Sequence, residues 1–279
     1  MSIHFRDRIY QRSLNDTAIY PQVSKSFIAE NFACQKGKGT KAARDRLKDY
    51  LHQFYDEYKT DGYVLKIDIK GYYPNMEHEF AEKMLKGYID DGTYDLAQKV
   101  LARLPGEVGY NPGSQIVQIV GITALDKIDH YIKEKLQIKY YIRYMDDGHA
   151  EGSKAEMLAL RGEIARAAES LGFRLHEAKT AIVKMSRGFM YLKIRYSVTD
   201  SGHIIRRMAR SGIVRMRRKM KRLRGLWLKG RVTLDDIFLS VKSWLGNVKK
   251  YCHGYRTRKR ILNLYYSLFR GYRMEGAIA

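Results

Sequence analysis

Apolar and polar residues alternate with a period of two along two segments of the chain, a pattern typical of β-strands. In residues 63–69 the odd-numbered positions are tyrosine, leucine and isoleucine, whereas Lys66 and Asp68 belong to the opposite face. In residues 138–145 isoleucine and tyrosine occupy the even-numbered positions. We expect this second strand to end at the turn-forming dipeptide Asp147-Gly148 and to open a hairpin.

Helices are predicted where apolar residues recur every three or four positions between glycine- and proline-rich breaks. Residues up to about 62 are expected to form helices on either side of a loop at 35–40. A second, irregular loop is expected at 105–113. Further strands are expected over 181–196, followed by a turn at 200–202. The remaining helices are predicted at residues 77–88, 94–104, 115–136, 155–171, 213–227, 234–253 and 258–272.

The predicted elements follow one another as a strand, helices, a hairpin, a helix and another strand, which is the order of a split βαβ (ferredoxin-like) unit. The fold class is therefore α+β. A chain of 279 residues is long enough to bury a substantial core, as one large domain or as two to three closely packed subdomains. The character of the chain changes near its last quarter, because Arg206 to Arg224 contains ten lysines or arginines.

Three acidic residues lie at the ends of the two predicted strands. Asp146 and Asp147 are adjacent at the expected hairpin tip, where their repulsion favours a divalent cation, although Asp-Asp-Gly is also ordinary turn chemistry. If the strand at 63–69 pairs beside the hairpin, Asp68 joins them in an oxygen-rich site suited to Mg2+. The alternative for Asp68 is a surface acid paired with a neighbouring lysine. Two such ions would activate an attacking hydroxyl and stabilise a leaving pyrophosphate.

The composition favours a polyanionic partner. Lysine and arginine number 52 against 30 acidic residues, a formal net charge of +22, and 22 tyrosines supply rings that stack on bases. The alternative is a generally soluble basic protein. The two cysteines show neither zinc nor disulfide spacing, and no signal peptide or run of 18 apolar residues is present, so we expect a cytoplasmic protein that does not span a membrane. The cluster Gly37-Lys38-Gly39-Thr40 lacks the order of a P-loop, which argues against an NTPase.

Five segments together resemble the motifs of bacterial-type reverse transcriptases, the group that spans retrons, group II introns and diversity-generating retroelements. Motifs A and C resemble LKIDIKGYYPNM (65–76) and YIRYMDDG (141–148). A fingers block resembles FIAENFACQKGKGTKAARDRL (27–47), motif B resembles NPGSQIVQIVGITALDKIDHYI (111–132), and motif D resembles LHEAKT (175–180). The similarity runs over nearly the whole chain in the family's order.

This resemblance implies a right-hand polymerase with fingers at 1–62, a palm with interleaved fingers helices at 63–204, and a basic helical thumb at 205–279. The implied reaction is RNA-directed DNA synthesis, in which dNTPs are added to a primer 3′-hydroxyl with two Mg2+ ions, or Mn2+ in their place. The implied partners are an RNA template, a DNA or RNA primer and dNTPs, with a structured RNA or a basic accessory protein as further candidates. The implied setting is a bacterial retroelement or an antiviral defence system.

The resemblance also assigns roles to individual residues. Lys179 would protonate the leaving pyrophosphate, and Tyr73 would crowd the 2′ position of an incoming nucleotide, although a solvated lysine and ordinary aromatic packing remain alternatives. Gln118 would contact the nucleotide or be an ordinary polar helix position. The metal-binding and catalytic carboxylates would be Asp68, Asp146 and Asp147. The nucleotide-binding residues would be Ile69, Tyr73, Gly113 and Gln118. The nucleic-acid-binding residues would be Lys36, Lys38, Lys193, Arg215, Arg218 and Arg222.

Two segments depart from the family's pattern. Gly148 to Glu151 replaces the apolar residues that usually follow the double aspartate, so we expect this return strand to be poorly packed or shortened. Lys193 replaces a glycine in the motif that approaches the primer. These departures leave open a second hypothesis, a catalytically impaired RNA-binding maturase or assembly subunit. An RNA-directed RNA polymerase is disfavoured by Tyr73.

Overall fold

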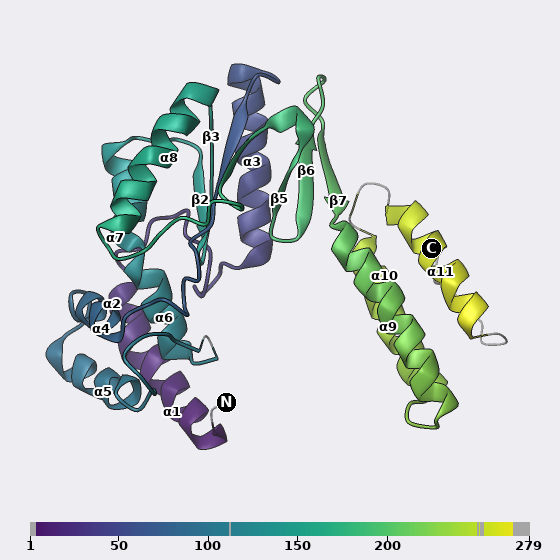
Figure 1. Ribbon diagram of the computed structural model, residues 1–279, viewed down its shortest axis with the longest axis horizontal. Helices are drawn as coiled ribbons and strands as arrows, with labels where there is room; N and C mark the ends of the chain where they lie inside the picture. The colour runs from purple at the N-terminus through teal and green to yellow at the C-terminus, as the bar shows by residue number, and fades with distance from the viewer. Residues whose placement is uncertain (1–3, 112, 250, 252–253, 270–279) are drawn as a thin grey trace. The chain divides into compact units, whose positions relative to one another are not determined.

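The computed structural model describes residues 4–111, 113–249, 251 and 254–269, and the chain divides into two compact units, Met1–Met185 and Ser186–Ala279 (Figure 1). Each unit contains a β-sheet and helices, which confirms the prediction of a mixed α and β fold. No helix among the described residues is long and apolar enough to cross a membrane. The subdomain boundaries predicted at residues 62 and 204 stay predictions.

The first unit is built on a four-stranded antiparallel sheet whose strand order is β2-β3-β1-β4. The strands are β1 (Tyr63–Ile67), β2 (Tyr141–Tyr144), β3 (Asp147–Gly152) and β4 (Ala181–Lys184). The predicted pairing of the first strand with the hairpin is therefore confirmed: β1 lies between β3 and β4. Leu65 and Ile67 are buried in the main core, as the period-two pattern predicted.

The hairpin differs from its prediction. Its turn consists of Met145 and Asp146, since Tyr144 pairs with Asp147, and Asp147 already belongs to β3. The expectation of a turn at Asp147-Gly148 is wrong. The expectation that Gly148 to Glu151 would be poorly packed or shortened is also wrong, because β3 has six residues, lies between two strands and is buried from Gly148 onward. Gly148 permits this close packing, since a Cβ there would lie 3.1 Å from Ile67 Cδ1.

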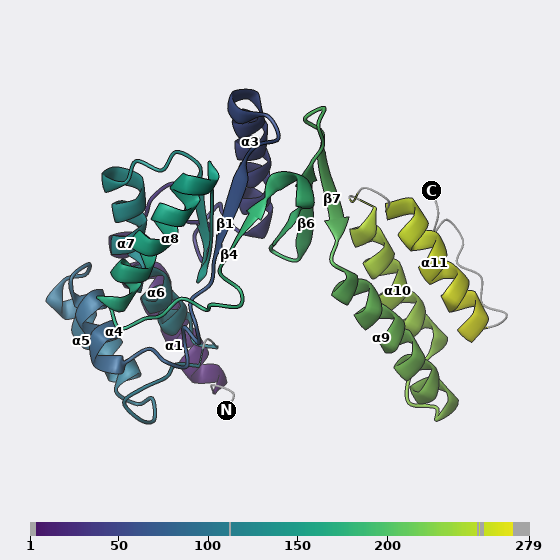
Figure 2. The same cartoon turned by 45° about the horizontal axis from the view of Figure 1, so that its top comes forward.

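Helices lie on both faces of this sheet. α8 (Lys154–Glu169) packs its buried residues against the core-facing side chains of β1, and α3 (Thr40–Tyr58) lies on the other side (Figure 1, Figure 2). Tyr140 marks that second face, with its ring 5.4 Å from the ring of Tyr50. The other helices of the unit are α1 (Phe5–Leu14), α2 (Tyr20–Val23), α4 (His78–Lys86), α5 (Asp91–Leu101), α6 (Gln115–Ala124) and α7 (Asp126–His130), with π-helical turns at Asn15–Ile19 and Tyr131–Lys135.

The helix predicted over 115–136 is interrupted. α6 ends at Ala124, Leu125 leaves the helical conformation with φ −99° and ψ 0°, and α7 begins at Asp126. A side-chain cap starts α6, because the Ser114 hydroxyl accepts a hydrogen bond from Val117 N–H. Asp129, which lies on α7 beyond the interruption, is fully buried and belongs to the site described below.

In its described residues, the second unit combines a three-stranded antiparallel sheet with three helices. The strands are β5 (Phe189–Tyr191), β6 (Ile194–Val198) and β7 (Ile204–Met208), and the helices are α9 (Arg210–Leu228), α10 (Leu234–Val248) and α11 (Gly254–Leu268). Met216, Met220 and Leu223 are buried, so the apolar stripe of the basic segment faces the helical core, as predicted. The β6–β7 turn is confirmed with Gly202 at φ +80°. The predicted helix ends at 253 and at 270–272 lie outside the described residues.

Candidate active site

The three predicted acids lie at one end of the first unit's sheet. Ile67, the last residue of β1, pairs with Gly148, so Asp68 is in register with Asp147 on the neighbouring antiparallel strand. Asp146 occupies the adjoining hairpin turn. Residues that are nearly 80 positions apart in the chain thus lie at the same sheet end because the strands pair.

The environment of Asp146 and Asp147 opposes their ionisation. Burial, followed by repulsion from Asp146 and Asp68, raises the pKa of Asp147 to about 6. Burial and the charge of Asp68 also raise the pKa of Asp146. Such a pair of partly buried carboxylates is stabilised by any cation that neutralises it, and oxygen ligands of this kind suit Mg2+.

Asp68 is held by the segment that contains Lys179. His176 N–H donates to the Asp68 carbonyl at 2.7 Å, and the Thr180 hydroxyl oxygen lies 3.2 Å from both the N and the O of the Asp68 backbone. The Lys179 ammonium lies 3.2 Å from each carboxylate oxygen of Asp68. The two predicted catalytic residues Asp68 and Lys179 therefore form an ion pair.

The chemistry of the three acids favours a metal site, whereas their arrangement does not. Three neighbouring carboxylates are the right chemistry for a divalent cation. Among the described residues, however, no group of three or more histidine, cysteine, aspartate or glutamate side chains is placed to hold a metal ion. Both carboxylate oxygens of Asp68 lie within 3.2 Å of the Lys179 ammonium.

Tyr73 packs against helix α6 close to the acids. A Cβ added at Gly121 would collide with the Tyr73 hydroxyl, and Tyr72 donates a hydrogen bond to the Gly121 carbonyl. The Tyr73 hydroxyl oxygen is buried and has no hydrogen-bond partner within the described part of the chain. Burial raises the pKa of Tyr73, and the charge of Asp146 adds to this effect, so the phenol remains neutral. Glycine at position 121 thus allows the ring to lie against the helix.

A polar cavity of about 420 Å³ adjoins the C-terminal end of β2. Its lining includes Lys36, Lys38, Gln118 and Tyr144, three of which were predicted to contact nucleotide or template. The cavity brings together residues from α1, from the loop before α3, from α6 and from β2. The Cys34 thiol, 3.7 Å from Gln118 Oε1, also borders it.

The two predicted lysines of this loop have different surroundings. The Lys38 ammonium donates to the carbonyls of Ala29 and Asn31, both at 2.9 Å, and burial lowers its pKa. Lys38 therefore stabilises the loop. The Lys36 ammonium instead lies 5.4 Å from the centre of the Tyr20 ring and borders the cavity. Lys36 is the better placed of the two to meet a phosphate.

The other predicted residues are dispersed. Ile69 is buried in the core and bridges to Leu175, so its side chain faces the protein interior. Gly113 is exposed in the loop before α6, and its N–H donates to Asn111 Oδ1. In the second unit, Lys193 is exposed in the β5–β6 turn with φ +67°. The arginines predicted to bind nucleic acid are exposed on α9, at Arg215, Arg218 and Arg222.

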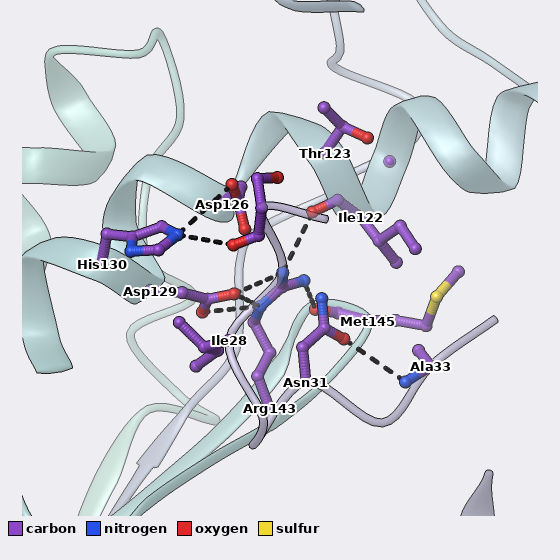
Figure 3. A network of polar contacts seen from close by, with 12 residues as sticks. Ile28, Asn31, Ala33, Ile122, Thr123, Asp126, Asp129, His130, Arg143 and Met145 are labelled. Atoms are coloured by element: carbon purple, nitrogen blue, oxygen red, sulfur yellow. Dashed lines mark hydrogen bonds and ion pairs between the residues drawn. The ribbon is translucent and has the colours of Figure 1, made fainter. Parts of the chain in front are cut away.

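A buried ion pair beside the acids was missed in the sequence. Arg143 on β2 is 3% exposed, and its Nε and Nη2 donate to the Asp129 carboxylate at 2.6–2.8 Å (Figure 3). Its Nη2 also donates to the Ile122 carbonyl at 3.0 Å, and its Nη1 to the Met145 carbonyl at 2.8 Å. Arg143 belongs to the odd-numbered positions of the alternating segment 138–145. A usable signal was the position of Asp129, because helical spacing places it on the same face as the apolar Leu125 and Ile132, where an acid needs a buried partner.

The contact with Met145 is energetically relevant. Met145 has φ +57°, a left-handed backbone conformation that costs a residue other than glycine about 1–3 kcal/mol. A hydrogen bond from a charged donor contributes about 1.5–3 kcal/mol. The Arg143 guanidinium can therefore offset the cost of the turn that carries Asp146.

The fold is similar to that of solved telomerase structures. No family model matches the chain, and neither does any curated protein sequence. Among solved structures, telomerase from Candida albicans in complex with a fragment of telomeric RNA matches 97% of this chain and 53% of its own, with 13% identity and a TM-score of 0.51. Apo telomerase from Candida tropicalis matches 95% of this chain and 51% of its own, with 11% identity and a TM-score of 0.53.

The likeness to telomerase concerns the fold, because the identities are far below the level at which activity is shared. The chain spans about half the length of the telomerase chains that it matches. The comparisons support a telomerase-like fold of mixed helices and sheets. They give no evidence on an arrangement of fingers, palm and thumb, and no support for the bacterial type.

Proposed function

We propose that this chain is a reverse-transcriptase-type polymerase, which extends a primer 3′-hydroxyl with dNTPs on an RNA template. One observation carries the proposal: in a telomerase-like fold, the pairing of Ile67 with Gly148 brings Asp68 to the sheet end where Asp147 begins β3 and Asp146 occupies the turn. The finer assignment, to a bacterial retroelement or a phage-defence system, rests on the motif resemblance.

The acids are the proposed metal ligands. Asp68, Asp146 and Asp147 would hold two Mg2+ ions, with Mn2+ as the alternative, and these ions lower the pKa of the attacking hydroxyl and neutralise the triphosphate when bound. Asp68 would exchange its ion pair with Lys179 for this ligation. The released Lys179 ammonium would then be available to donate a proton to the departing pyrophosphate.

The polar cavity and Tyr73 are the proposed nucleotide site. Lys36 supplies a cation at the cavity wall for the triphosphate, and Gln118 supplies an amide for hydrogen bonds. Tyr73 supplies a ring whose position is fixed by α6, so it would exclude a 2′-hydroxyl by volume. Gly113 and Ile69 would contribute backbone, since neither offers an exposed side chain that recognises a nucleotide.

The second unit is the proposed nucleic-acid-binding thumb. α9 buries its apolar stripe and exposes Arg215, Arg218 and Arg222, so the exposed face is strongly basic. Arginine side chains of this kind bind phosphates and release counterions. The first 62 residues would serve as fingers, and the four-stranded sheet would serve as the palm.

Primer extension tests the proposal. Purified protein is given an RNA template, an annealed DNA primer, dNTPs and Mg2+, and extension by the wild type is expected. Asp146→Asn should abolish extension, since it removes a charged ligand, while affinity for the template–primer stays within about threefold. Asp91→Asn, which changes an exposed acid of α5, is the matched control and should extend normally. Extension by Asp146→Asn at the wild-type rate would refute the assignment.

The surroundings of Asp68 favour a second candidate function. The engagement of Asp68 by Lys179 and the lack of a three-ligand group among the described residues would suit an RNA-binding maturase or assembly subunit with impaired chemistry. The well-packed strand β3 removes one of the reasons for this hypothesis. Tight RNA binding without extension in either Mg2+ or Mn2+ would favour the subunit.

A further inference from the structure

Arg143 touches three separate elements around the proposed active site. Its guanidinium is paired with Asp129 on α7, and it also donates to a carbonyl near the C-terminal end of α6 and to the Met145 carbonyl in the β2–β3 turn. Figure 3 shows the guanidinium between these three partners. Met145 directly precedes Asp146, so the contact lies one residue from a proposed metal ligand.

The surroundings leave Arg143 little freedom. Asp129 is fully buried, and its Oδ1 also accepts a hydrogen bond from the Tyr141 hydroxyl at 2.8 Å. A buried charge is stable only when it is paired and its hydrogen bonds are satisfied. The carboxylate therefore fixes the plane of the guanidinium, and the plane fixes the direction of the N–H that meets Met145.

We propose that the buried Arg143–Asp129 pair is the positioning element of the catalytic turn: it holds Met145 in its left-handed conformation and so orients the Asp146 carboxylate toward the end of β1. The inference deepens the proposed polymerase function and rests on it for its catalytic consequence. The structural consequence, a fixed Met145 turn, is independent of the reaction.

The same guanidinium connects the turn to the support of Tyr73. Ile122, whose carbonyl accepts from Nη2, is next to Gly121, against which the Tyr73 ring lies. A lysine cannot replace this arrangement, since a single ammonium does not present the planar fork that reaches a carboxylate and two carbonyls in different directions. The role is that of a positioning residue, because Arg143 is buried and acts through the backbone of Met145.

Steady-state kinetics on three variants test the catalytic consequence. Arg143→Lys and Asp129→Asn should lower kcat about 100-fold, since small misplacements of reacting groups have effects of this size, while KM for the template–primer stays within twofold. Arg166→Lys is the matched control: it makes the same substitution at an exposed arginine of α8 that pairs with Glu163 and has no part in the proposed network, and it should keep kcat within threefold. Unchanged kcat in both test variants would overturn the proposal.

Methyl NMR separates this inference from the polymerase assignment. The protein contains 11 methionines, and 13C-methyl labelling with a Met145→Leu reference identifies the Met145 signal. This signal should shift or broaden in Arg143→Lys and Asp129→Asn but not in Arg166→Lys. An unmoved signal in the folded variants overturns the positioning role, even if wild-type protein extends primers. A moved signal supports the role even if wild-type protein does not extend them, in which case the polymerase proposal alone fails.

Thermal melting, followed by circular dichroism, shows which variants fold. If Arg143→Lys does not fold, Asp129→Asn is used for the test. Asn is expected to leave the protein folded, because it keeps the size of the side chain and an oxygen that accepts from the guanidinium. Loss of the folded state is thus not taken as support for the proposal.

Discussion

Tyr73 illustrates how a single side chain acquires a role from its surroundings. Its hydroxyl is buried and, among the described residues, makes no hydrogen bond, which is normally unfavourable for a polar group. Its ring position is set by Gly121, where any side chain would collide with it. The ring itself, and not the hydroxyl, is therefore the feature that the surrounding structure keeps in place.

We predict that Tyr73→Ala increases rNTP incorporation relative to dNTP by at least tenfold, because loss of the ring opens space for a 2′-hydroxyl. The measurement is the ratio of kcat/KM for matched rNTP and dNTP in primer extension. Tyr73→Phe is the control, and it should keep the wild-type ratio, since the hydroxyl makes no hydrogen bond to any residue that the structure describes. An unchanged ratio in Tyr73→Ala would remove the gate role.

Strand β3 contains a buried acidic residue, Glu151. Glu151 is 4% exposed, and within the described residues neither of its carboxylate oxygens has a hydrogen-bond partner. Burial raises the pKa of Glu151 well above its usual value, because desolvation favours the protonated side chain over the charged one in the folded protein. The strand thus favours a neutral carboxylic acid over a buried charge at this position.

This protonation makes stability depend on pH. The unfolded chain releases the Glu151 proton above its ordinary pKa, near 4.3, while the folded chain retains it, so stability falls as pH rises from that value toward the raised pKa. The loss is about 1.4 kcal/mol for each pH unit in this interval. Glutamine does not titrate, so Glu151→Gln does not lose stability in this way as pH rises. We predict that its Tm exceeds that of the wild type by a small amount at pH 5 and by a larger amount at pH 8.

Thermal melts at several pH values measure this gain. Glu169→Gln, which alters an exposed glutamate of α8, is the control and should show no growing difference between pH 5 and pH 8. A Tm difference for Glu151→Gln that does not change with pH would show that Glu151 is not held in the neutral form.

At the scale of the whole molecule, charge dominates. The chain carries a formal net charge of +22, and ten lysines or arginines lie between Arg206 and Arg224, largely on α9. Basic residues that contact phosphates release bound counterions, so their contribution to affinity weakens as salt concentration rises. The second unit is therefore expected to contribute affinity for nucleic acid without sequence preference.

We predict that the combined substitution Arg215→Gln, Arg218→Gln and Arg222→Gln weakens binding to an RNA–DNA duplex and makes the dependence of log affinity on log salt less steep. The slope should fall by about one for each phosphate that is no longer neutralised, hence by about three. Binding titrations between 50 and 300 mM salt, about the range where such effects are resolved, measure the slope.

A matched control removes the same charge elsewhere. Lys48→Gln, Lys127→Gln and Lys154→Gln together neutralise three exposed lysines of the first unit. Equal changes of slope in the two triple variants would show that α9 has no special part in binding, since net charge alone would then explain the effect.

The sequence by itself determined the local structure and the donor chemistry. Period-two patterns located β1 and β2, and spacings of three and four residues located the helices, because both patterns reflect which side of an element faces the core. The strand pattern also placed Asp68 on the face opposite to the buried residues. The aspartates at 146 and 147 were visible as a pair, and the basic helix α9 was visible with its apolar stripe.

The tertiary structure alone decided how these parts meet. The turn falls at Met145-Asp146 because Tyr144 pairs with Asp147, and the buried Arg143 donates a hydrogen bond to the Met145 carbonyl in this turn. Lys38 binds loop carbonyls and Lys179 binds Asp68, although both look like free cations in the sequence. Pairing, burial and ion-pair choice depend on contacts between residues far apart in the chain, and a local pattern contains no information on which distant partner a side chain will meet.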